Sequence, residues 1–442
     1  MQIPESVGFC IRALEQAGFT AYAVGGCVRD HCLGRQPDDF DLCTNAKPEE
    51  MEQVFADRPL VLAGKKHGTV AVVMGKELVE ITTYRTEGAY SDNRHPDWVE
   101  FVDRIEEDLA RRDYTINAMA YSPRLGYADP FGGREDLKNG ILRAVGEPAA
   151  RFREDSLRIL RGVRFAVKYH LEVEPQTEKA MFDLAPLMDN LARERVFTEL
   201  CKLLPLVTAR DLQRFAPILA QVLPEVGAEM GFQQHSPHHA YDVYTHTAYV
   251  VEHVDGDLAL RWAALLHDIG KVPTFTRDET GRGHFRGHAP KGGEMAEGVL
   301  HRLKAPNALT DTVVTLVANH MTKIEPTKKA VRRLLSRLSW ENTERLLHLQ
   351  KADMMSKGVE NDGDLTQFDT LWALLEEIRR EDACLSIKDL QINGRDLMAL
   401  GLKGPKIGQT LNALLDLVLD EQLPNHREAL LKEAARLASV SP

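Results

Sequence analysis

The first third of the chain alternates short apolar runs with amphipathic stretches. Four runs rich in β-branched and aromatic residues lie between residues 20 and 84: TAYAVGG, FDLCT, TVAVVMG and ELVEITTY. Each has the length of a strand. Between them, PEEMEQVFA (48–56) places apolar residues at three- and four-residue intervals, which is typical of a helix. Residues 21–145 are therefore predicted to form an antiparallel or mixed sheet with helices packed on it.

The pattern changes at about residue 150. From there to the end, helical periodicity dominates, as in TEKAMFDLAPLMDNL (177–191) and KIGQTLNALLDLVLDEQL (406–423), and Pro and Gly punctuate it. The charge-rich segment 277–293 is predicted to be a surface loop. The fold class is α+β, with an α/β head followed by an all-α body.

Charge and hydropathy limit the partners. No run of about 18 apolar residues occurs, so no membrane partner is expected. The first 19 residues resemble an amphipathic helix more than a signal peptide, which favours a cytoplasmic location. The net charge of −11 argues against binding nucleic acid over the whole surface. Residues 152–170 nevertheless carry five basic residues at helical spacing, a local patch that RNA could contact.

The stretch GGCVRDHCLGRQPDDFDL (25–42) carries candidate chemistry. Side chains two apart in a strand share a face, so Asp39 and Asp41 aim their carboxylates at one point. Such a pair can bridge two Mg²⁺ ions, one activating a hydroxyl and the other a leaving pyrophosphate. Glu80, on a later strand, is a third acidic candidate.

The residues before this acidic pair suit a polyphosphate. Gly25 and Gly26 permit close approach of the phosphates to the backbone. Val28-Arg29-Asp30 would open a helix whose positive end faces them, and Arg29 can neutralise triphosphate charge.

A second pair can select a base. Asp155 and Arg158 are three residues apart in EDSLRILRGVRF, so on a helix they would project side by side. A carboxylate only accepts hydrogen bonds and a guanidinium only donates them. Cytosine and adenine each offer an amino donor beside a ring acceptor, whereas uracil and guanine offer the reverse. The pair therefore predicts that C and A are favoured over U and G by a factor of roughly 10⁴ or more. The competing interpretation is an ion pair local to the helix.

The helical body contains a separate set of ligand-type residues. ALLHDIGK (264–271) places a His-Asp pair on an otherwise apolar helix, and further histidines and an aspartate follow on other predicted helices. The candidate ligands are His246, His267, Asp268, His288, His320 and Asp353. Imidazoles with carboxylates suit a divalent metal and water activation. The alternative is a scaffold that has kept these side chains without using them.

Five ordered motifs resemble those of class II tRNA nucleotidyltransferases, the CCA-adding enzymes of the DNA polymerase β superfamily. They are GGCVRDHCLGRQPDDFDL, RRDYTINAMA (111–120), DPFGGREDL (129–137), EDSLRILRGVRF (154–165) and RERVFTEL (193–200). The resemblance implies a polymerase-β-like head and the substrates CTP, ATP and the 3′ end of tRNA. It also implies that Arg112, Asp113 and Asn117 meet the nucleotide, and that Asp155 and Arg158 read the base with Arg161 and Arg164 nearby.

Two features distinguish neighbouring families. AGKKHGTVAVV (63–73) looks like the CCA-adding form rather than its poly(A) polymerase counterpart. Residues 85–113 appear full length, whereas enzymes that add only CC are shortened there. Complete CCA addition is favoured, and a poly(A) polymerase or a CC- or A-only enzyme is the alternative.

The His/Asp set resembles the HD-domain phosphohydrolases, with His246, His267, Asp268 and Asp353 at the signature positions. His288 and His320 match accessory histidines of two-metal members. The resemblance implies an unidentified divalent metal and a second, phosphohydrolase activity. The alternative is that phosphate hydrolysis is the main activity of the protein. We expect a nucleotidyltransferase head at 1–145, a neck with the nucleotide-selecting motif at 146–205, a connector at 206–235, an HD domain at 236–355 and a helical tail at 356–442.

Overall fold

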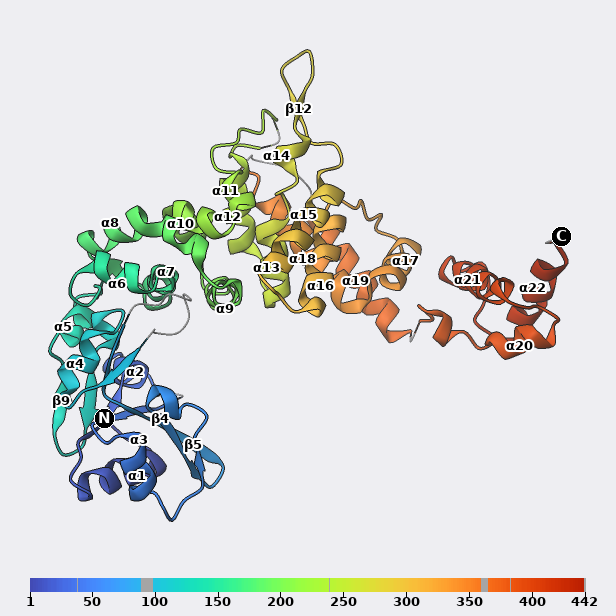
Figure 1. Cartoon of the computed structure of the whole chain (residues 1–442). Coiled ribbons are helices and arrows are strands. Elements are labelled where there is room, and N and C mark those ends of the chain that lie inside the picture. Colours follow the sequence, from blue (N-terminus) through green and yellow to red (C-terminus); the bar gives the residue numbers. More distant parts are fainter. Residues whose placement is uncertain (38, 89–97, 238, 359–364, 382, 441–442) are drawn as a thin grey trace. The chain divides into compact units, whose positions relative to one another are not determined.

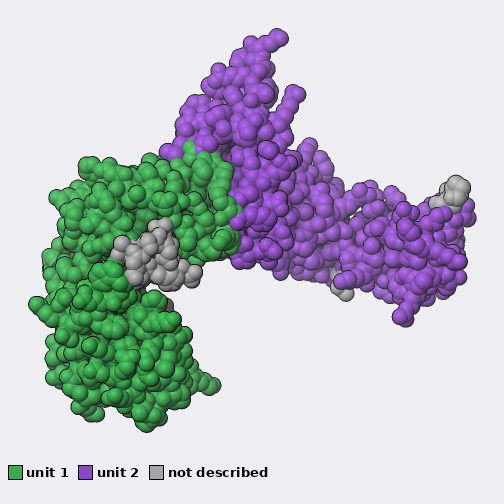
Figure 2. Space-filling view, in the orientation of Figure 1, with its two compact units in different colours: residues 1–227, 302–304 green, residues 228–301, 305–442 purple. Residues whose placement is uncertain are grey.

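The chain forms two compact units in the computed structural model, which describes residues 1–37, 39–88, 98–237, 239–358, 365–381 and 383–440 (Figures 1 and 2). Unit 1 consists of residues 1–227 and 302–304, and unit 2 of residues 228–301 and 305–442. The finer division into five segments stays a prediction. Of the segment 85–113, residues 89–97 lie outside the described part.

Unit 1 contains a seven-stranded mixed sheet in the order β3-β4-β5-β2-β1-β8-β9. Its strands are β1 (Ala21–Val24), β2 (Asp41–Thr44), β3 (Leu60–Val61), β4 (Thr69–Met74), β5 (Glu77–Thr83), β8 (Ala120–Ser122) and β9 (Gly126–Ala128). Only the pair β2 and β5 is parallel within this sheet, and its other pairs are antiparallel. The four apolar runs of the sequence become β1, β2, β4 and β5, which confirms the predicted head.

One face of this sheet is covered by helices. The helix α1 (Glu5–Gln16) presents Val7, Cys10, Ile11 and Leu14 at three- and four-residue spacing, and all four are buried. Together with α3 (Pro48–Val54) it packs on β1, β2, β4 and β5 (Figure 1). The other face is partly covered, because Val24 and Cys43 pack against α4 (Ile105–Ala110). The remainder of that face contains the acidic residues.

The rest of unit 1 is mainly helical. Its helices are α1 (Glu5–Gln16), α2 (Gly26–Cys32), α3 (Pro48–Val54), η1 (Lys65–His67), α4 (Ile105–Ala110), η2 (Thr115–Asn117), α5 (Gly133–Lys138), α6 (Pro148–Glu154), α7 (Leu157–Tyr169), α8 (Pro175–Leu184), η3 (Ala185–Asn190), α9 (Arg193–Leu203), α10 (Ala209–Val222) and α11 (Pro224–Gly227). Two short ribbons pair β6 (Arg85–Glu87) with β7 (Val99–Phe101) and β10 (Ile141–Leu142) with β11 (Glu172–Val173).

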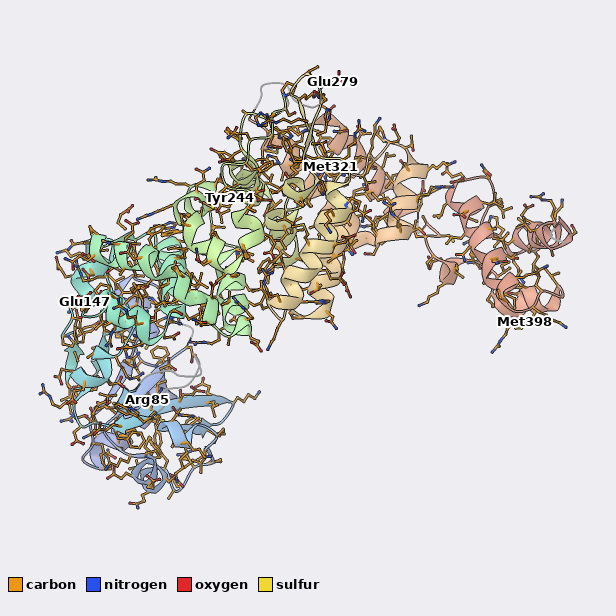
Figure 3. All side chains as sticks on the ribbon, turned by 45° about the horizontal axis from the view of Figure 1, so that its top comes forward. Arg85, Glu147, Tyr244, Glu279, Met321 and Met398 are labelled. Carbon is orange, nitrogen blue, oxygen red and sulfur yellow. The ribbon has the colours of Figure 1, made fainter. Side chains whose placement is uncertain are left out.

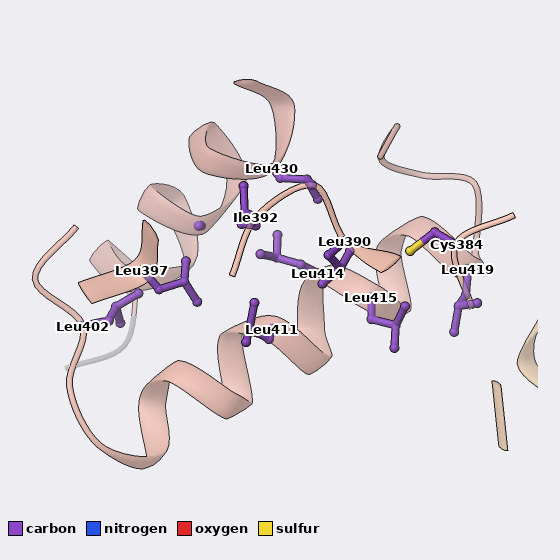
Figure 4. Close-up of a cluster of buried hydrophobic side chains, with 11 residues drawn as sticks. Cys384, Leu390, Ile392, Leu397, Leu402, Leu411, Leu414, Leu415, Leu419 and Leu430 are labelled. Atoms are coloured by element: carbon purple, nitrogen blue, oxygen red, sulfur yellow. The ribbon is translucent and has the colours of Figure 1, made fainter. Parts of the chain in front are cut away.

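Unit 2 is built from helices, as the periodicity predicted. They are α12 (Val243–His253), α13 (Leu258–Leu266), α14 (Lys271–Thr274), α15 (His288–Arg302), α16 (Asn307–Asn319), α17 (Lys328–Leu338), α18 (Trp340–Met355), α19 (Thr366–Arg380), η4 (Ile387–Asp389), α20 (Gly394–Ala399), α21 (Pro405–Leu419) and α22 (Arg427–Val440). The last three enclose a core that includes Leu397, Leu414 and Leu430 (Figure 4). Among the described residues, none of the helices is both long and apolar enough to cross a membrane.

The segment 277–293 differs from the predicted loop. It forms a hairpin of β12 (Thr276–Arg277) and β13 (Gly283–His284), with Glu279 near its tip, and then enters α15 (Figure 3). The turn closes because Asp278 accepts hydrogen bonds from the backbone of Thr280 and Arg282, and Gly281 has a φ of +82°. Local turn chemistry thus overrides the polar composition.

Candidate functional site

Acidic residues lie on the open part of one face of the head sheet, on its central strands β2 and β5 and in the loop before β2. Asp41 begins β2, and its neighbour Leu42 aligns with Ile81 of the parallel strand β5, so Asp41 and Glu80 share a face. Asp39 lies in the loop before β2, where its Oδ1 accepts from the Phe40 backbone at 2.9 Å, so the expectation that both aspartates belong to the strand was wrong. The pKa of Asp41 is raised by partial desolvation and then by the charge of Asp39, while Arg112 opposes this effect. A cation would relieve this repulsion.

The glycine turn lies beside these carboxylates. Gly25 has a φ of +76°, and a Cβ there would lie 3.0 Å from the Arg112 guanidinium and 3.7 Å from the Asn117 carbonyl oxygen. A side chain would therefore both strain the turn and displace Arg112. Arg112 forms an ion pair with the buried Asp108 at 3.2 Å, and its buried Nε has no hydrogen-bond partner among the described residues. The Arg112 side chain thus lies close to the Gly25 turn, and its Nε–H is not used in a hydrogen bond with another described residue.

A chain of polar contacts joins the first, second and fourth motifs. Arg29 donates to the Asn117 side-chain oxygen, and the Asn117 amide donates to Asp113 Oδ1 at 3.0 Å. The other oxygen of Asp113 accepts from Arg161 Nη2 at 2.7 Å. Burial would raise the pKa of Asp113, but Arg161 and Asn117 outweigh it and lower the pKa to about 2. Arg29 also lies 4.6 Å from the ring centre of Tyr169. Four predicted nucleotide residues are therefore brought together.

The predicted base-reading residues Asp155 and Arg158 do not lie on the one continuous helix that the sequence had suggested. Asp155 is not on the helix of Arg158, because it ends α6 with an extended conformation and α7 begins at Leu157. Its carboxylate accepts from Leu157 N at 3.1 Å and forms an ion pair with Arg195 Nη2 at 2.7 Å. Arg158 donates to Glu154 at 2.8 Å and to the Arg111 carbonyl at 2.9 Å. The two side chains are thus held by separate partners.

Other residues of this region were missed from the sequence. Arg164, expected near the nucleotide, donates to the buried Glu199 of α9 at 2.6 Å. Arg195 stands in the quoted fifth motif, but nothing in its spacing assigned it to Asp155. The buried Asp108 holds both Arg111 and Arg112. Its three- and four-residue spacing from them in EEDLARRD was the available signal.

In unit 2 the six predicted metal ligands converge. They come from α12, the ends of α13 and α16, the start of α15, and α18. Ligand atoms lie within 4.8 Å of one another in two groups, which share Asp268: His246, His267, Asp268 and Asp353; and Asp268, His288 and His320. His246 Nε2 lies 2.9 Å from Asp353, and His267 Nε2 lies 3.1 Å from Asp268.

The orientation of the four imidazoles suits metal ligation. Each Nδ1 lies 2.7–3.1 Å from a backbone carbonyl oxygen, so each Nδ1 carries a proton and donates it. In a neutral ring, each Nε2 is then a lone-pair acceptor facing the cluster. Two such acceptors, of His288 and His320, stand 3.2 Å apart. Facing lone pairs repel unless a cation lies between them, so this donor set fits a metal ion.

Charged groups surround these ligands. Without a metal ion, burial lowers the pKa of His267, but Asp268 and Asp353 outweigh it and raise the pKa to about 10, so a bound metal would displace a proton from its Nε2. Lys271, three residues after Asp268, lies 2.7 Å from its Oδ2 and 2.9 Å from Gln234 Oε1. Glu229 is fully buried, neither carboxylate oxygen has a hydrogen-bond partner among the described residues, and burial raises its pKa to about 8. Sequence reasoning missed both Lys271 and Glu229.

Three family models match parts of the chain. Residues 21–143 match a poly A polymerase head domain, and residues 170–226 match a probable RNA and SrmB-binding site of polymerase A. Residues 291–434 match a putative tRNA nucleotidyltransferase domain 2.

Individual proteins and structures are similar as well. A CCA-adding enzyme of Lactiplantibacillus plantarum is 32% identical over 97% of this chain and 95% of its own length. One of Streptococcus suis is 49% identical over 44% of this chain, so the aligned part spans about half (48%) of that relative. The crystal structure of a Bacillus stearothermophilus CCA-adding enzyme in complex with CTP covers 99% of this chain and 98% of its own, with a TM-score of 0.71 and 28% identity.

Proposed function

The chain belongs to the CCA-adding enzymes, and from this premise we propose that it adds C, C and A to the 3′ end of tRNA from CTP and ATP, releasing pyrophosphate. The observation that carries the proposal is the acidic start of β2 beside the Gly25 turn and Arg112, since nucleotidyl transfer needs carboxylates and a phosphate-binding turn at one place. Because tRNA, CTP and ATP are cytoplasmic, we also propose a cytoplasmic location.

In the proposed site, Asp39 and Asp41, with Glu80 beside them, hold the metal. A set of hard carboxylate oxygens fits Mg²⁺. Bound there, Mg²⁺ would lower the pKa of the attacking hydroxyl and stabilise the leaving pyrophosphate. Gly25 and Gly26 let the triphosphate approach the backbone, and Arg112 offers the unpartnered Nε. Arg29 contributes positive charge while Asn117 fixes its orientation.

Base selection follows from the hydrogen-bonding capacity that remains at the break between α6 and α7. The Asp155 carboxylate has about four acceptor positions, of which Leu157 and Arg195 occupy three. One acceptor is left for an exocyclic amino group. Arg158 has five N–H groups and uses three on Glu154 and on the carbonyls of Arg151 and Arg111. Two donors remain for a ring nitrogen, which suits C and A and excludes U and G.

Gel-resolved extension tests this function. Transfer RNAs that end before, within and after CC are incubated with Mg²⁺, CTP and ATP. Addition of three, two and one nucleotides is expected, respectively. A long A tail would assign a poly(A) polymerase, and products that stop at CC or gain only A would assign a partial enzyme. No extension of any of these RNAs would remove the proposal.

A second function is supported by the His/Asp cluster of unit 2. We propose that it binds a divalent metal and hydrolyses phosphate esters such as 2′,3′-cyclic phosphates or monoesters. A cavity of about 330 Å³ opens beside Asp268 and Asp353, and Lys271, Arg286 and Lys357 line it. Met321, which is labelled in Figure 3 and is 59% exposed, also lines this cavity. Positive side chains beside a metal suit a phosphoryl group.

Metal analysis of the purified protein tests this second function apart from the first. About one to two divalent ions per chain are expected, and Asp353→Asn should lose them while CCA addition persists. Asp369→Asn, an exposed position on α19, is the matched control and should keep them. Hydrolysis of a cyclic phosphate should follow the metal content. A metal content that is zero in all three proteins would leave the cluster a scaffold.

A further inference from the structure

An exposed apolar strip adjoins the acidic residues on the open face of the head sheet. Val61 of β3 aligns with Ala71 of β4, and Val73 of β4 aligns with Leu78 of β5. Ala71 aligns with Glu80. Aligned side chains share a face and alternate along each strand, so Val61, Val73 and Leu78 all lie on the face of Glu80. These three residues are called the apolar strip.

Its exposure contrasts with the reverse face of the same strands. Val61 and Leu78 are 44% and 50% exposed, whereas Val70, Val72 and Val79, which point the other way, are between 0% and 3% exposed. The helices α1 and α3 cover that reverse face. In the part of the chain that the structure describes, the strip has no comparable cover. Exposed apolar side chains beside catalytic carboxylates suggest contact with a substrate.

The order of the strands indicates which substrate. On one side of β2 lie β1 and β8, whose ends carry Gly25 and, shortly before β8, Asn117. That side receives the nucleotide. On the other side of β2 lie β5, β4 and β3 with the strip. In-line transfer requires the attacking hydroxyl to be opposite the leaving pyrophosphate. The RNA 3′ end must then approach across β5, β4 and β3.

We propose that the apolar strip is the platform on which the terminal nucleoside of the acceptor RNA rests. This proposal depends on the proposed CCA addition and deepens it. Each round of addition starts from a different end, first the unextended tRNA, then C, then CC. An aliphatic surface offers no donor or acceptor, so it supports any base equally, unlike the Asp155 and Arg158 side chains that choose the incoming base.

Charge near the strip agrees with an RNA partner. Lys66 in η1 and Lys76 in the turn between β4 and β5 are both exposed, and neither forms an ion pair with another described residue. Lys66 follows Val61 by five residues along the chain, and Lys76 precedes Leu78 by two. Such lysines can contact backbone phosphates without reading sequence.

The test replaces both exposed members of the strip, as Val61→Ser with Leu78→Ser. The KM for a tRNA acceptor should rise about tenfold, because the contact area with the nucleoside is lost. The increase should be similar for ends of different base. The affinity for CTP measured without RNA should change less than about twofold, and the melting temperature should not fall, since both residues are exposed.

Leu125→Ser provides the matched control. Leu125 is 41% exposed in the turn between β8 and β9, at the opposite edge of the same sheet, and its replacement should leave the KM for tRNA unchanged. An unchanged KM for tRNA in the double variant would overturn the platform while the wild-type extension upheld CCA addition. If the affinity for CTP fell as much as the affinity for tRNA, the strip would be part of the nucleotide site and the platform would be overturned. A large fall in melting temperature would show that the strip stabilises the fold instead of binding RNA. A wild-type protein that extends no tRNA would remove the proposed function and the platform together.

Discussion

Replacing Arg195 by alanine removes the side chain that fixes Asp155 at the break between α6 and α7. The two groups form a forked contact, with Nη1–Oδ1 at 3.3 Å and Nη2–Oδ2 at 2.7 Å. Their side chains are only 24% and 11% exposed, so water replaces the lost partner poorly. Without Arg195, Asp155 keeps only its contact with the Leu157 backbone and can rotate away from the base.

The expected magnitude follows from that contact. Hydrogen bonds to a charged partner contribute about 1.5–3 kcal/mol. At about 1.4 kcal/mol per tenfold change, kcat/KM for CTP should fall about 10- to 100-fold. The kcat/KM for UTP should change little, because the O4 of uracil gains nothing from a carboxylate. Discrimination between CTP and UTP should therefore shrink by the same factor.

Single-nucleotide incorporation into a tRNA that lacks CCA measures both constants. Arg195→Lys is informative, because lysine restores the charge without the planar fork and should recover stability more than selectivity. Arg193→Ala is the matched control, since Arg193 lies in the first turn of the same helix and, among the described residues, its side chain donates to the Asp189 carbonyl and not to Asp155. Selectivity that is unchanged in Arg195→Ala, or lost equally in Arg193→Ala, would refute the role given to Asp155.

Two further predictions concern the framework of the site. Asp113→Asn should lower the free energy of unfolding by about 2 kcal/mol at pH 7, because the folded pKa of about 2 lies below the ordinary value near 3.9. That stabilisation is complete above about pH 5 and is lost as the pH falls through 4 towards 2, so denaturant titrations should show the wild type and the variant converging in acid; a constant difference would contradict the pairing with Arg161. Gly162→Ala should cost about 1–3 kcal/mol, because its Cβ would lie 2.0 Å from the Tyr114 hydroxyl, which donates to the Arg158 carbonyl at 2.7 Å. Adding Tyr114→Phe should recover part of the melting temperature, and additive losses would argue against this contact.

The sequence predicted the framework better than the contacts. Strand periodicity identified β1, β2, β4 and β5, because that pattern is local to one element. The metal ligands, which lie on five separate helices, were identified from their residue types and from the resemblance to HD-domain proteins. The break at Asp155 was not predictable from spacing, since a helix through 154–165 satisfies the same periodicity. The fork from Arg195 was also hidden, because it joins residues 40 positions apart. Long-range partners of charged side chains depend on how helices pack, which a periodic pattern does not encode.

The most direct test of the account replaces the acidic pair and leaves the His/Asp cluster intact. Asp39→Asn with Asp41→Asn keeps the size of both side chains and removes the charges proposed to hold Mg²⁺, and Asp268→Asn serves as the comparison in unit 2. In gel-resolved extension of a tRNA without CCA, we expect the double variant to add no nucleotide and Asp268→Asn to add three. The melting temperatures of the double variant and the wild type should be equal. Full extension by the double variant, or loss of extension with Asp268→Asn alone, would contradict nucleotide transfer at Asp39 and Asp41 of the head.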